Sequence, residues 1–227
     1  MSDGVHGGSV RPLYVFSHGW GFDAGFWDGL RARLPGEDVA VLDWGYFGAP
    51  LLPPPSPGRP LIAVGHSYGA MLLLQLSAVK WAGFVAVNGF ARFSQADDYP
   101  GARRRVIDQM LKRFDEAPAA VLADFRARCG AAEPPPPGLD VQRLRAGLVA
   151  LRDDDARDAA AALACPALLL AGDADPIVSP ETTRASAACF RHATVEWLAG
   201  GGHLSPRLAP DWCVGHLTAF AARLTGE

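Results

Sequence analysis

LIAVGHSYGAMLLLQLSAV, residues 61–79, is the stretch that decides the fold of this chain. It begins with a short apolar run at 61–65, typical of a buried strand, and ends with an almost wholly apolar segment at 70–79, suited to a buried helix. Between them stands the GxSxG sequence Gly65-His66-Ser67-Tyr68-Gly69. Glycines two residues either side of a serine allow a sharp turn without a Cβ clash. Such a turn projects the hydroxyl above a sheet, so the pattern predicts a nucleophilic Ser67.

Further apolar runs predict more buried strands, and helical patterns separate several of them. The predicted strands are 13–17, 39–42, 61–65, 84–87, 167–171 and 194–198, and the predicted helices outside the middle of the chain are 23–34, 70–79, 181–190 and 211–224. Strands that alternate with helices predict the α/β class, with a mainly parallel sheet and right-handed crossovers. A length of 227 residues suits one domain, residues 1–227.

The strand signal disappears over residues 94–163, where helical patterns rich in Arg, Asp and Ala take over, broken by the prolines 134–137. Because this insertion follows the fourth predicted strand, it should emerge at the carboxyl edge of the sheet and cover a site there as a helical lid. A second proline-rich stretch, 53–60, leaves only about ten residues between Leu51 and Leu61, too few for a crossover helix. We expect one helix of the usual architecture to be missing there.

Composition excludes several classes of protein. With 49% hydrophobic residues, 20% charged residues and a formal net charge of −3, neither disorder nor nucleic-acid binding is indicated. No stretch approaches the ~20 apolar residues of a membrane span, and no basic segment leads into an apolar one at the start, so we expect a cytoplasmic protein. The four cysteines lie far apart without a CxxC motif, which favours buried thiols over a metal site or a disulfide framework.

A serine nucleophile needs a histidine base at the same edge of the sheet. His203 lies in the glycine-rich loop 199–203, directly after a predicted strand and after the serine in chain order. The other histidines are interpreted as structural: His6, His18, His66, His192 and His216. The alternative for His203 is a solvent-exposed loop histidine.

The base in turn needs a carboxylate, which should also follow a strand. Residues 171–176, AGDADP, offer Asp173 and Asp175. Asp175 is preferred because it lies farther into the turn and Pro176 fixes the backbone behind it, whereas Asp173 is suited to capping the turn. Asp173 remains the alternative.

A tetrahedral oxyanion needs two backbone N–H donors, one commonly from the residue after the nucleophile and one from the turn after the first strand. Here these are Tyr68 and, within His18-Gly19-Trp20-Gly21, Trp20. The Trp20 indole could line an acyl pocket or be a large apolar cover. This chemistry requires no metal or organic cofactor, and the sequence contains no ligand cluster for one.

The motifs together resemble the pimeloyl-[acyl-carrier protein] methyl ester carboxylesterases of biotin synthesis, within the α/β hydrolases. The segments that carry the resemblance are HGWGFDAGFW (18–27), GHSYG (65–69), AVNGFARFSQADDYPG (86–101), LAGDADPIV (170–178) and GGGHLSP (200–206). The Ser, Asp and His motifs are common to the superfamily, whereas the tryptophan of HGWG and the segment 93–101 are more selective. The middle of the lid is not covered.

The resemblance implies the α/β-hydrolase fold, a catalytic Ser67, Asp175 and His203, and oxyanion donors at Trp20 and Tyr68. It also implies that Phe125 lines the substrate channel from the lid. Only twelve residues precede Leu13, so we expect the antiparallel hairpin that usually opens the fold to be absent or vestigial. The chain is therefore expected to be a compact form of the fold.

The lid is rich in arginine although the whole chain is acidic. The resemblance implies an acyl-carrier protein as partner, and such a protein is acidic, so a basic lid could steer and hold it. The candidate docking residues are Arg103, Arg104, Arg105, Arg126 and Arg128. The alternative, of equal weight, is that these arginines form ordinary solvated helix faces.

Three functions follow from these observations. The first is hydrolysis of the methyl ester of pimeloyl-acyl-carrier protein in biotin synthesis. The second keeps the same residues but acts on small esters or lactones, as a general carboxylesterase or lactonase. The third is a binding protein on a hydrolase scaffold without turnover, which the presence of serine, aspartate and histidine candidates disfavours. No nucleic-acid or membrane partner is expected.

Overall fold

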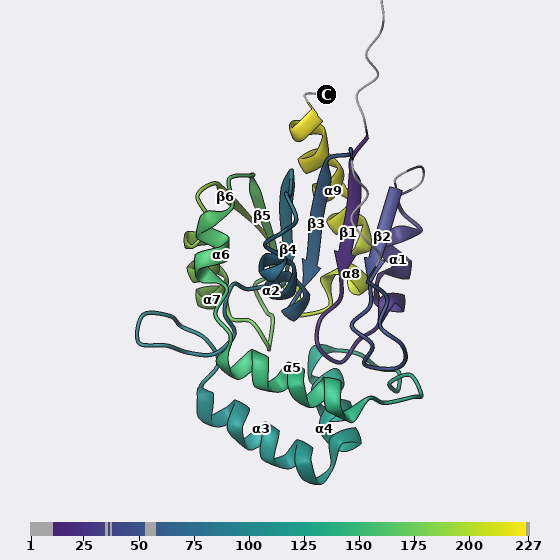
Figure 1. Ribbon diagram of the computed structural model, residues 1–227, viewed down its shortest axis with the longest axis vertical. Helices are drawn as coiled ribbons and strands as arrows, with labels where there is room; N and C mark the ends of the chain where they lie inside the picture. The colour runs from purple at the N-terminus through teal and green to yellow at the C-terminus, as the bar shows by residue number, and fades with distance from the viewer. Residues whose placement is uncertain (1–10, 35, 37, 53–57, 226–227) are drawn as a thin grey trace, which may run out of the picture.

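A computed structural model describes residues 11–34, 36, 38–52 and 58–225 of the chain, and it contains one six-stranded sheet (Figure 1). The strands are β1 (Leu13–Ser17), β2 (Asp38–Leu42), β3 (Leu61–His66), β4 (Gly83–Val87), β5 (Ala167–Gly172) and β6 (Ala193–Leu198). Their order is β2-β1-β3-β4-β5-β6, and every neighbouring pair is parallel. The predicted parallel α/β sheet is confirmed.

Helices cover both faces of this sheet (Figure 1). One face carries α2 (Tyr68–Gln75), α6 (Arg157–Ala162) and α7 (Pro180–Ala188); the other carries the 3₁₀ helix η1 (Ala24–Trp27), α1 (Asp28–Arg31), α8 (Ser205–Leu208) and α9 (Pro210–Thr225). The single helix predicted over 23–34 is thus two short helical pieces that end at Arg31. The helix predicted over 70–79 begins earlier, at Tyr68, and ends earlier, at Gln75.

Because both faces are covered, the central strands β3, β4 and β5 are buried at every position rather than at alternate ones. Along β3, Ala63 packs into a cluster that contains Leu73 of α2, whereas Ile62 and Val64 pack into the opposite cluster with Leu217 of α9. All four of these β3 and α2 side chains are fully buried. The continuous apolar run that predicted a buried strand reflects this two-sided packing.

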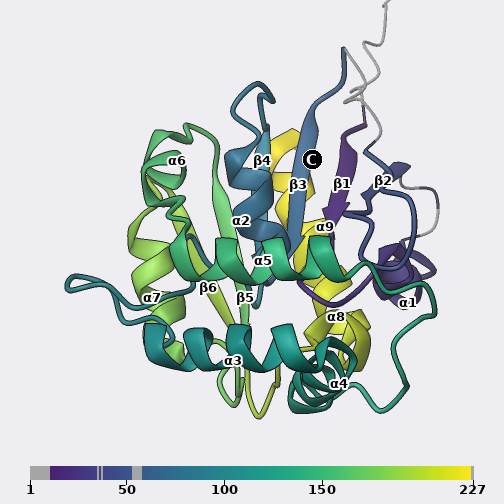
Figure 2. The ribbon, with the colours of Figure 1, turned by 60° about the horizontal axis from the view of Figure 1, so that its bottom comes forward.

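The lid consists of α3 (Arg104–Glu116), α4 (Pro118–Cys129) and α5 (Val141–Asp153), which lie beyond the carboxyl ends of the strands (Figures 1 and 2). In α3 the side chains of Ile107, Leu111 and Phe114 are buried at the spacing of one helical face. Both views place α5 between the sheet edge and α3. Within the predicted insertion 94–163, α6 differs: it contacts α2 on a face of the sheet, so the covering part ends with α5.

An ion-pair network lies at the base of the lid, where the chain leaves the core before α3 and returns to it after α5. Arg92 Nη1 lies 2.7 Å from Asp155 Oδ2, and Arg157 lies 2.8 Å both from Asp155 and from Asp98. The Arg157 guanidinium also lies 5.4 Å from the ring centroid of Tyr99. The network therefore joins the segment before α3 to the segment after α5.

The proline-rich connection between β2 and β3 falls partly outside the described residues, since 53–57 are not among them. The described residues on either side, 43–52 and 58–60, form turns and a bridge between Asp43 and Leu51, with no helix. The expectation of a missing opening hairpin concerns residues 1–12, most of which likewise lie outside the described part. Among described helices, none has the length and apolar character needed to cross a membrane.

Candidate active site

Ser67 occupies the sharp turn between β3 and α2, in a backbone conformation that non-glycine residues rarely adopt (φ 53°, ψ −125°). The flanking glycines are needed for close packing. A Cβ on Gly65 would overlap the backbone of Ala70, and a Cβ on Gly69 would lie 2.5 Å from the carbonyl oxygen of His18. The GxSxG spacing is therefore explained by sterics around the turn.

The structure brings Ser67, His203 and Asp175 into one hydrogen-bonded chain. His203 Nε2 lies 3.0 Å from Ser67 Oγ, and His203 Nδ1 lies 2.8 Å from Asp175 Oδ2. The three residues follow β3, β6 and β5 respectively, so all lie at the carboxyl edge. Their exposed fractions are only 5%, 1% and 8%. In this arrangement the imidazole can take the serine proton while the carboxylate fixes the tautomer with a proton on Nδ1.

The Asp175 carboxylate is held rigidly by further donors. Its Oδ1 accepts hydrogen bonds from the backbone N–H groups of Ile177 (2.7 Å) and Val178 (3.0 Å). Asp173, the alternative acid, instead accepts a hydrogen bond from the backbone N–H of Gly200 (2.7 Å) and stabilises the loop that carries His203. The two carboxylates thus have separate positions, and Asp175 is the one beside the imidazole.

Asn88 is a site residue that the sequence analysis missed. It follows β4, is 1% exposed and has a positive φ of 48°. Its side-chain Nδ2 donates to Asp175 Oδ2 (2.9 Å) and to the carbonyl oxygen of Gly202 (3.2 Å), which links the acid to the loop before His203. The sequence did contain a signal for it: Asn88 is a polar residue directly after an apolar strand. Because the carboxyl ends of parallel strands share one edge, such a residue is expected near the site.

Trp20 and Tyr68 both lie close to Ser67: Tyr68 directly follows it in the chain, and Trp20 lies in the loop after β1. A Cβ on Gly19 would approach Ser67 Cβ to 2.9 Å, so the loop after β1 packs directly against the turn. Tyr68 is the first residue of α2. Within the described part of the chain, neither backbone N–H donates to a protein acceptor. Both groups are therefore available to a negatively charged oxygen formed next to Ser67.

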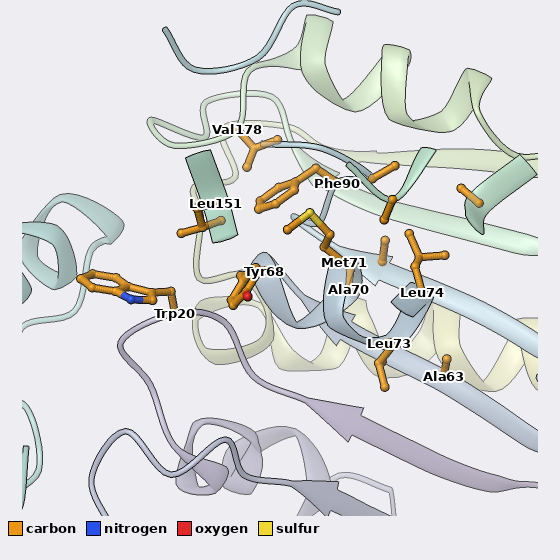
Figure 3. Close-up of a cluster of buried hydrophobic side chains, with 14 of the residues drawn as sticks. Trp20, Ala63, Tyr68, Ala70, Met71, Leu73, Leu74, Phe90, Leu151 and Val178 are labelled. Carbon is orange, nitrogen blue, oxygen red and sulfur yellow. The ribbon is translucent and has the colours of Figure 1, made fainter. Parts of the chain in front are cut away.

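The Trp20 side chain connects this loop to the lid. Its Nε1 donates to the carbonyl oxygen of Leu144 in α5 (2.8 Å), and its ring meets Phe125 of α4 edge-on at a centroid distance of 4.9 Å. Figure 3 shows Trp20 and Tyr68 near Phe90, which follows β4, and Leu151 of α5. The indole thus covers the site and fixes the lid above it.

A cavity of about 260 Å³ extends from Ser67 into the lid. Its apolar lining residues are Trp20, Phe90, Phe93, Ala102, Val106, Ile107, Met110, Phe125, Leu148, Leu151 and Ile177. Phe125 therefore lies where the family resemblance implies. Among the described residues that line it, Arg103 and Arg128 carry a charge. An apolar chain with a reactive carbonyl at the Ser67 end matches this lining.

The candidate docking arginines separate into different environments. Arg103, Arg104, Arg105 and Arg128 are exposed. Arg126 is only 4% exposed: it donates to the carbonyl oxygen of Gly21 (2.9 Å), pairs with Glu133 (3.0 Å) and lies over the ring of Phe22. Burial lowers the pKa of Arg126 from its ordinary value. The prediction that Arg126 belongs to an exposed docking surface is wrong, because its side chain anchors α4 to the loop after β1.

The other histidines that the structure describes are not part of the hydrogen-bonded chain formed by the side chains of Ser67, His203 and Asp175. His66 is buried, and burial followed by the nearby His203 lowers its pKa well below the ordinary value, so the ring is neutral and its Nε2 donates to the carbonyl oxygen of His203 (2.9 Å). His18 is fully buried at the end of β1, and His216 contacts Trp212 on α9. His192 is exposed before β6, and His6 lies outside the described residues.

The cysteines are all free thiols, at Cys129, Cys165, Cys189 and Cys213. Among the residues that the structure describes, no group of three or more His, Cys, Asp or Glu side chains is arranged to hold a metal ion.

Known proteins with similar sequences agree with this architecture. The model of the alpha/beta hydrolase family matches residues 55–216. A pimeloyl-[acyl-carrier protein] methyl ester esterase of Xanthomonas axonopodis pv. citri is 28% identical over 85% of this chain and 88% of the relative. A protein of the same name from Photorhabdus laumondii is also 28% identical, over 92% of each chain.

Solved structures share the fold at lower identity. An esterase from Exiguobacterium antarcticum superposes with a TM-score of 0.78 at 16% identity, covering 94% of this chain and 92% of the other. A bromoperoxidase from Bacillus anthracis gives 0.79 at 18% identity with the same coverage. These likenesses concern the fold alone. With the family model matched over most of the chain and a GxSxG turn on a parallel sheet, the chain belongs to the α/β-hydrolase family.

Proposed function

We propose that this protein is a serine carboxylesterase that hydrolyses the methyl ester of pimeloyl-acyl-carrier protein. The observation that carries the esterase chemistry is the hydrogen-bonded chain from Ser67 through His203 to Asp175, at the inner end of an apolar cavity. The names of the relatives from Xanthomonas and Photorhabdus support the substrate. The acyl chain would occupy the cavity, and the carrier protein would remain outside the lid.

In the first half-reaction, Ser67 Oγ attacks the ester carbonyl as His203 Nε2 takes its proton. Asp175 stabilises the resulting imidazolium. The negative charge on the former carbonyl oxygen is stabilised by the backbone N–H groups of Trp20 and Tyr68. Collapse of the tetrahedral intermediate breaks the bond to the methoxy oxygen, and the imidazolium donates its proton so that methanol leaves.

The second half-reaction releases the acid. Water attacks the carbonyl of the acyl-serine ester, and His203 accepts a proton from it. The new tetrahedral intermediate uses the same two N–H donors. When it collapses, the bond to Ser67 Oγ breaks, the serine regains its proton from His203, and the carboxylic acid departs and loses its proton to solvent.

A general carboxylesterase is the second candidate, and one observation favours it. Several lid arginines are neutralised by local carboxylates: Arg104 pairs with Asp153 at 2.8 Å, and Arg145 pairs with Asp115 at 2.6 Å. Such pairs reduce the positive field that would attract an acidic carrier protein. Over the insertion 94–163 the sequence holds 11 Lys and Arg residues against 12 Asp and Glu residues, so the lid region as a whole carries no net positive charge.

The test compares pimeloyl-acyl-carrier protein methyl ester with p-nitrophenyl esters, using wild type and Ser67→Ala. We expect wild type to hydrolyse both and to restore biotin-independent growth to a host that lacks its own pimeloyl-ester esterase, and Ser67→Ala to do neither. Growth rescue by Ser67→Ala would refute the assignment of Ser67. Turnover of small esters without turnover of the carrier-bound ester would favour the general carboxylesterase. Failure of a fluorophosphonate probe to label Ser67 would favour a binding protein.

A further inference from the structure

The outer end of the cavity differs chemically from its inner end. Val106, Met110, Phe125 and Arg128 line both the cavity over Ser67 and a second hollow between α3 and α4. The cavity therefore continues toward the surface between these two helices. Arg103 and Arg128 are exposed although they line the cavity, which places them at its opening.

These two arginines also differ from several other lid arginines in how their charge is balanced. Arg104, Arg113 and Arg145 each pair with a carboxylate at 2.6–2.8 Å. Among the described residues, no carboxylate pairs with Arg103 or Arg128. Within the described part of the chain, the Arg128 guanidinium donates one hydrogen bond, to the carbonyl oxygen of Pro176 (3.1 Å). Since a guanidinium carries five N–H donors, most of its donors remain free.

We propose that Arg103 and Arg128 form an anion-binding pair at the mouth of the cavity, which selects esters whose acyl chain carries a negatively charged oxyacid group at its far end. The ligand would have the ester carbonyl at Ser67, an apolar chain along Phe90 and Phe125, and the anion at the pair. Guanidinium groups match the oxygen geometry of carboxylates and phosphates, and the apolar walls exclude a charge from anywhere deeper in the cavity.

The proposal deepens the proposed function and rests on it, because it concerns the substrate of the same site. The anionic group could be the carboxylate of a dicarboxylic acid monoester or the phosphodiester of a phosphopantetheine arm. Both present oxygens that accept hydrogen bonds from arginine. The pair acts on the substrate itself and so differs from a surface that docks a whole carrier protein.

The experiment measures kcat/KM for three matched substrates at low and high salt. The first is the monomethyl ester of a medium-chain α,ω-dicarboxylic acid, the second is the methyl ester of a monocarboxylic acid of equal chain length, and the third is the same monomethyl acyl group as a thioester of phosphopantetheine without carrier protein. The variants are Arg103→Gln, Arg128→Gln and Arg128→Lys. Arg105→Gln is the matched control, because Arg105 is exposed in the first turn of α3, two residues after Arg103, and is not among the residues that line the cavity.

We expect wild type to prefer at least one of the two anionic substrates over the neutral ester by about tenfold, and salt to reduce that preference. Each Gln variant should raise KM for the anionic substrate about fivefold and leave the neutral ester unchanged. Arg128→Lys should keep part of the preference, and Arg105→Gln should keep all of it. A preference confined to the phosphopantetheine thioester would also support the pair and would identify the phosphodiester as the ligand.

No preference for either anionic substrate, or an equal loss in Arg105→Gln, would overturn the proposal. Loss of turnover on the neutral ester in the Gln variants would also overturn it, since that would indicate a packing role.

Binding of the intact esters to Ser67→Ala, measured by calorimetry, tests the pair without turnover. If wild type hydrolysed none of the esters while Ser67→Ala still bound the anionic one through both arginines, the proposed function would fail and the anion site would stand. Equal binding of the neutral and anionic esters would refute the anion site.

Discussion

The substitution Gly69→Ala tests whether the packing of the serine turn controls catalysis. The new Cβ would lie 2.5 Å from the carbonyl oxygen of His18 and closer still to that of Ser17. Ordinary van der Waals contacts between such atoms begin at about 3.4 Å. The turn must therefore move by about 1 Å relative to the end of β1. Both opposing atoms are backbone, and no side chain can rotate away.

Such a movement separates Ser67 from the loop that carries Trp20. A misplacement of about 1 Å costs about 100-fold in rate, equivalent to about 2.7 kcal/mol. The overpacking itself should lower the free energy of unfolding by about 1–3 kcal/mol. We therefore expect kcat/KM for a p-nitrophenyl ester to fall about 100-fold in a protein that still folds.

The control is Gly215→Ala, on the exposed side of α9, where an added Cβ would meet nothing within 4 Å. It should leave kcat/KM unchanged and raise the free energy of unfolding by about 0.5–1 kcal/mol, because alanine favours helix interiors. Both variants are measured by urea denaturation and steady-state kinetics, with circular dichroism to verify folding. A Gly69→Ala protein with wild-type kcat/KM would refute the steric reasoning.

Two further predictions concern carboxylates. Asp175→Asn should lower kcat by about 10⁴-fold by favouring the wrong imidazole tautomer. Asp173→Asn should cost far less, because the Asp173 carboxylate accepts a hydrogen bond from the Gly200 backbone and not from the His203 imidazole; a reversed order in steady-state kinetics would exchange their roles. At the base of the lid, hydrogen bonds from Arg157 lower the pKa of Asp155 to about 2, below the 3.8 of the unfolded chain. A depressed pKa stabilises the fold above about pH 4, and this contribution is lost as the pH falls toward about 2. Asp155→Asn should therefore lower the free energy of unfolding by about 1–2 kcal/mol at pH 7, with the difference from wild type shrinking below about pH 4 in urea titrations, and an equal difference at all pH values would contradict the assignment.

The sequence predicted the strands of the sheet and the candidate site residues at its carboxyl edge. The strands follow from local apolar runs, and the common edge follows from one topological rule. Apolar runs identify strands that are buried on both faces, as in β3 and β5. Polar residues directly after such strands must meet at the carboxyl edge. That rule placed Ser67, Asp175 and His203 near one another, and it could have placed Asn88 there as well. The structural geometry adds the hydrogen-bond partners, which no spacing along the chain specifies.

The environments of the lid arginines could not be predicted from the sequence, because they depend on contacts between distant segments. Arg126 and Arg128 are two residues apart on α4, yet one is buried against Gly21 and the other is exposed at the cavity mouth. Similarly, the ion pair between Arg145 and Asp115 joins α5 to α3. Counting arginines therefore overestimates the positive charge that the lid presents. Which charges are free is decided by how the lid helices pack.

Trp20 shows how the catalytic edge and the lid depend on each other. Its backbone N–H belongs to the loop that packs against Ser67, whereas its indole donates to Leu144 and packs against Phe125 in the lid. A movement of α4 or α5 must therefore be absorbed by the Trp20 side chain or transmitted to its backbone. In the proposed mechanism, oxyanion stabilisation depends on donors held in place before the reaction, so the packing of the lid would contribute to the chemical step as well as to substrate selection.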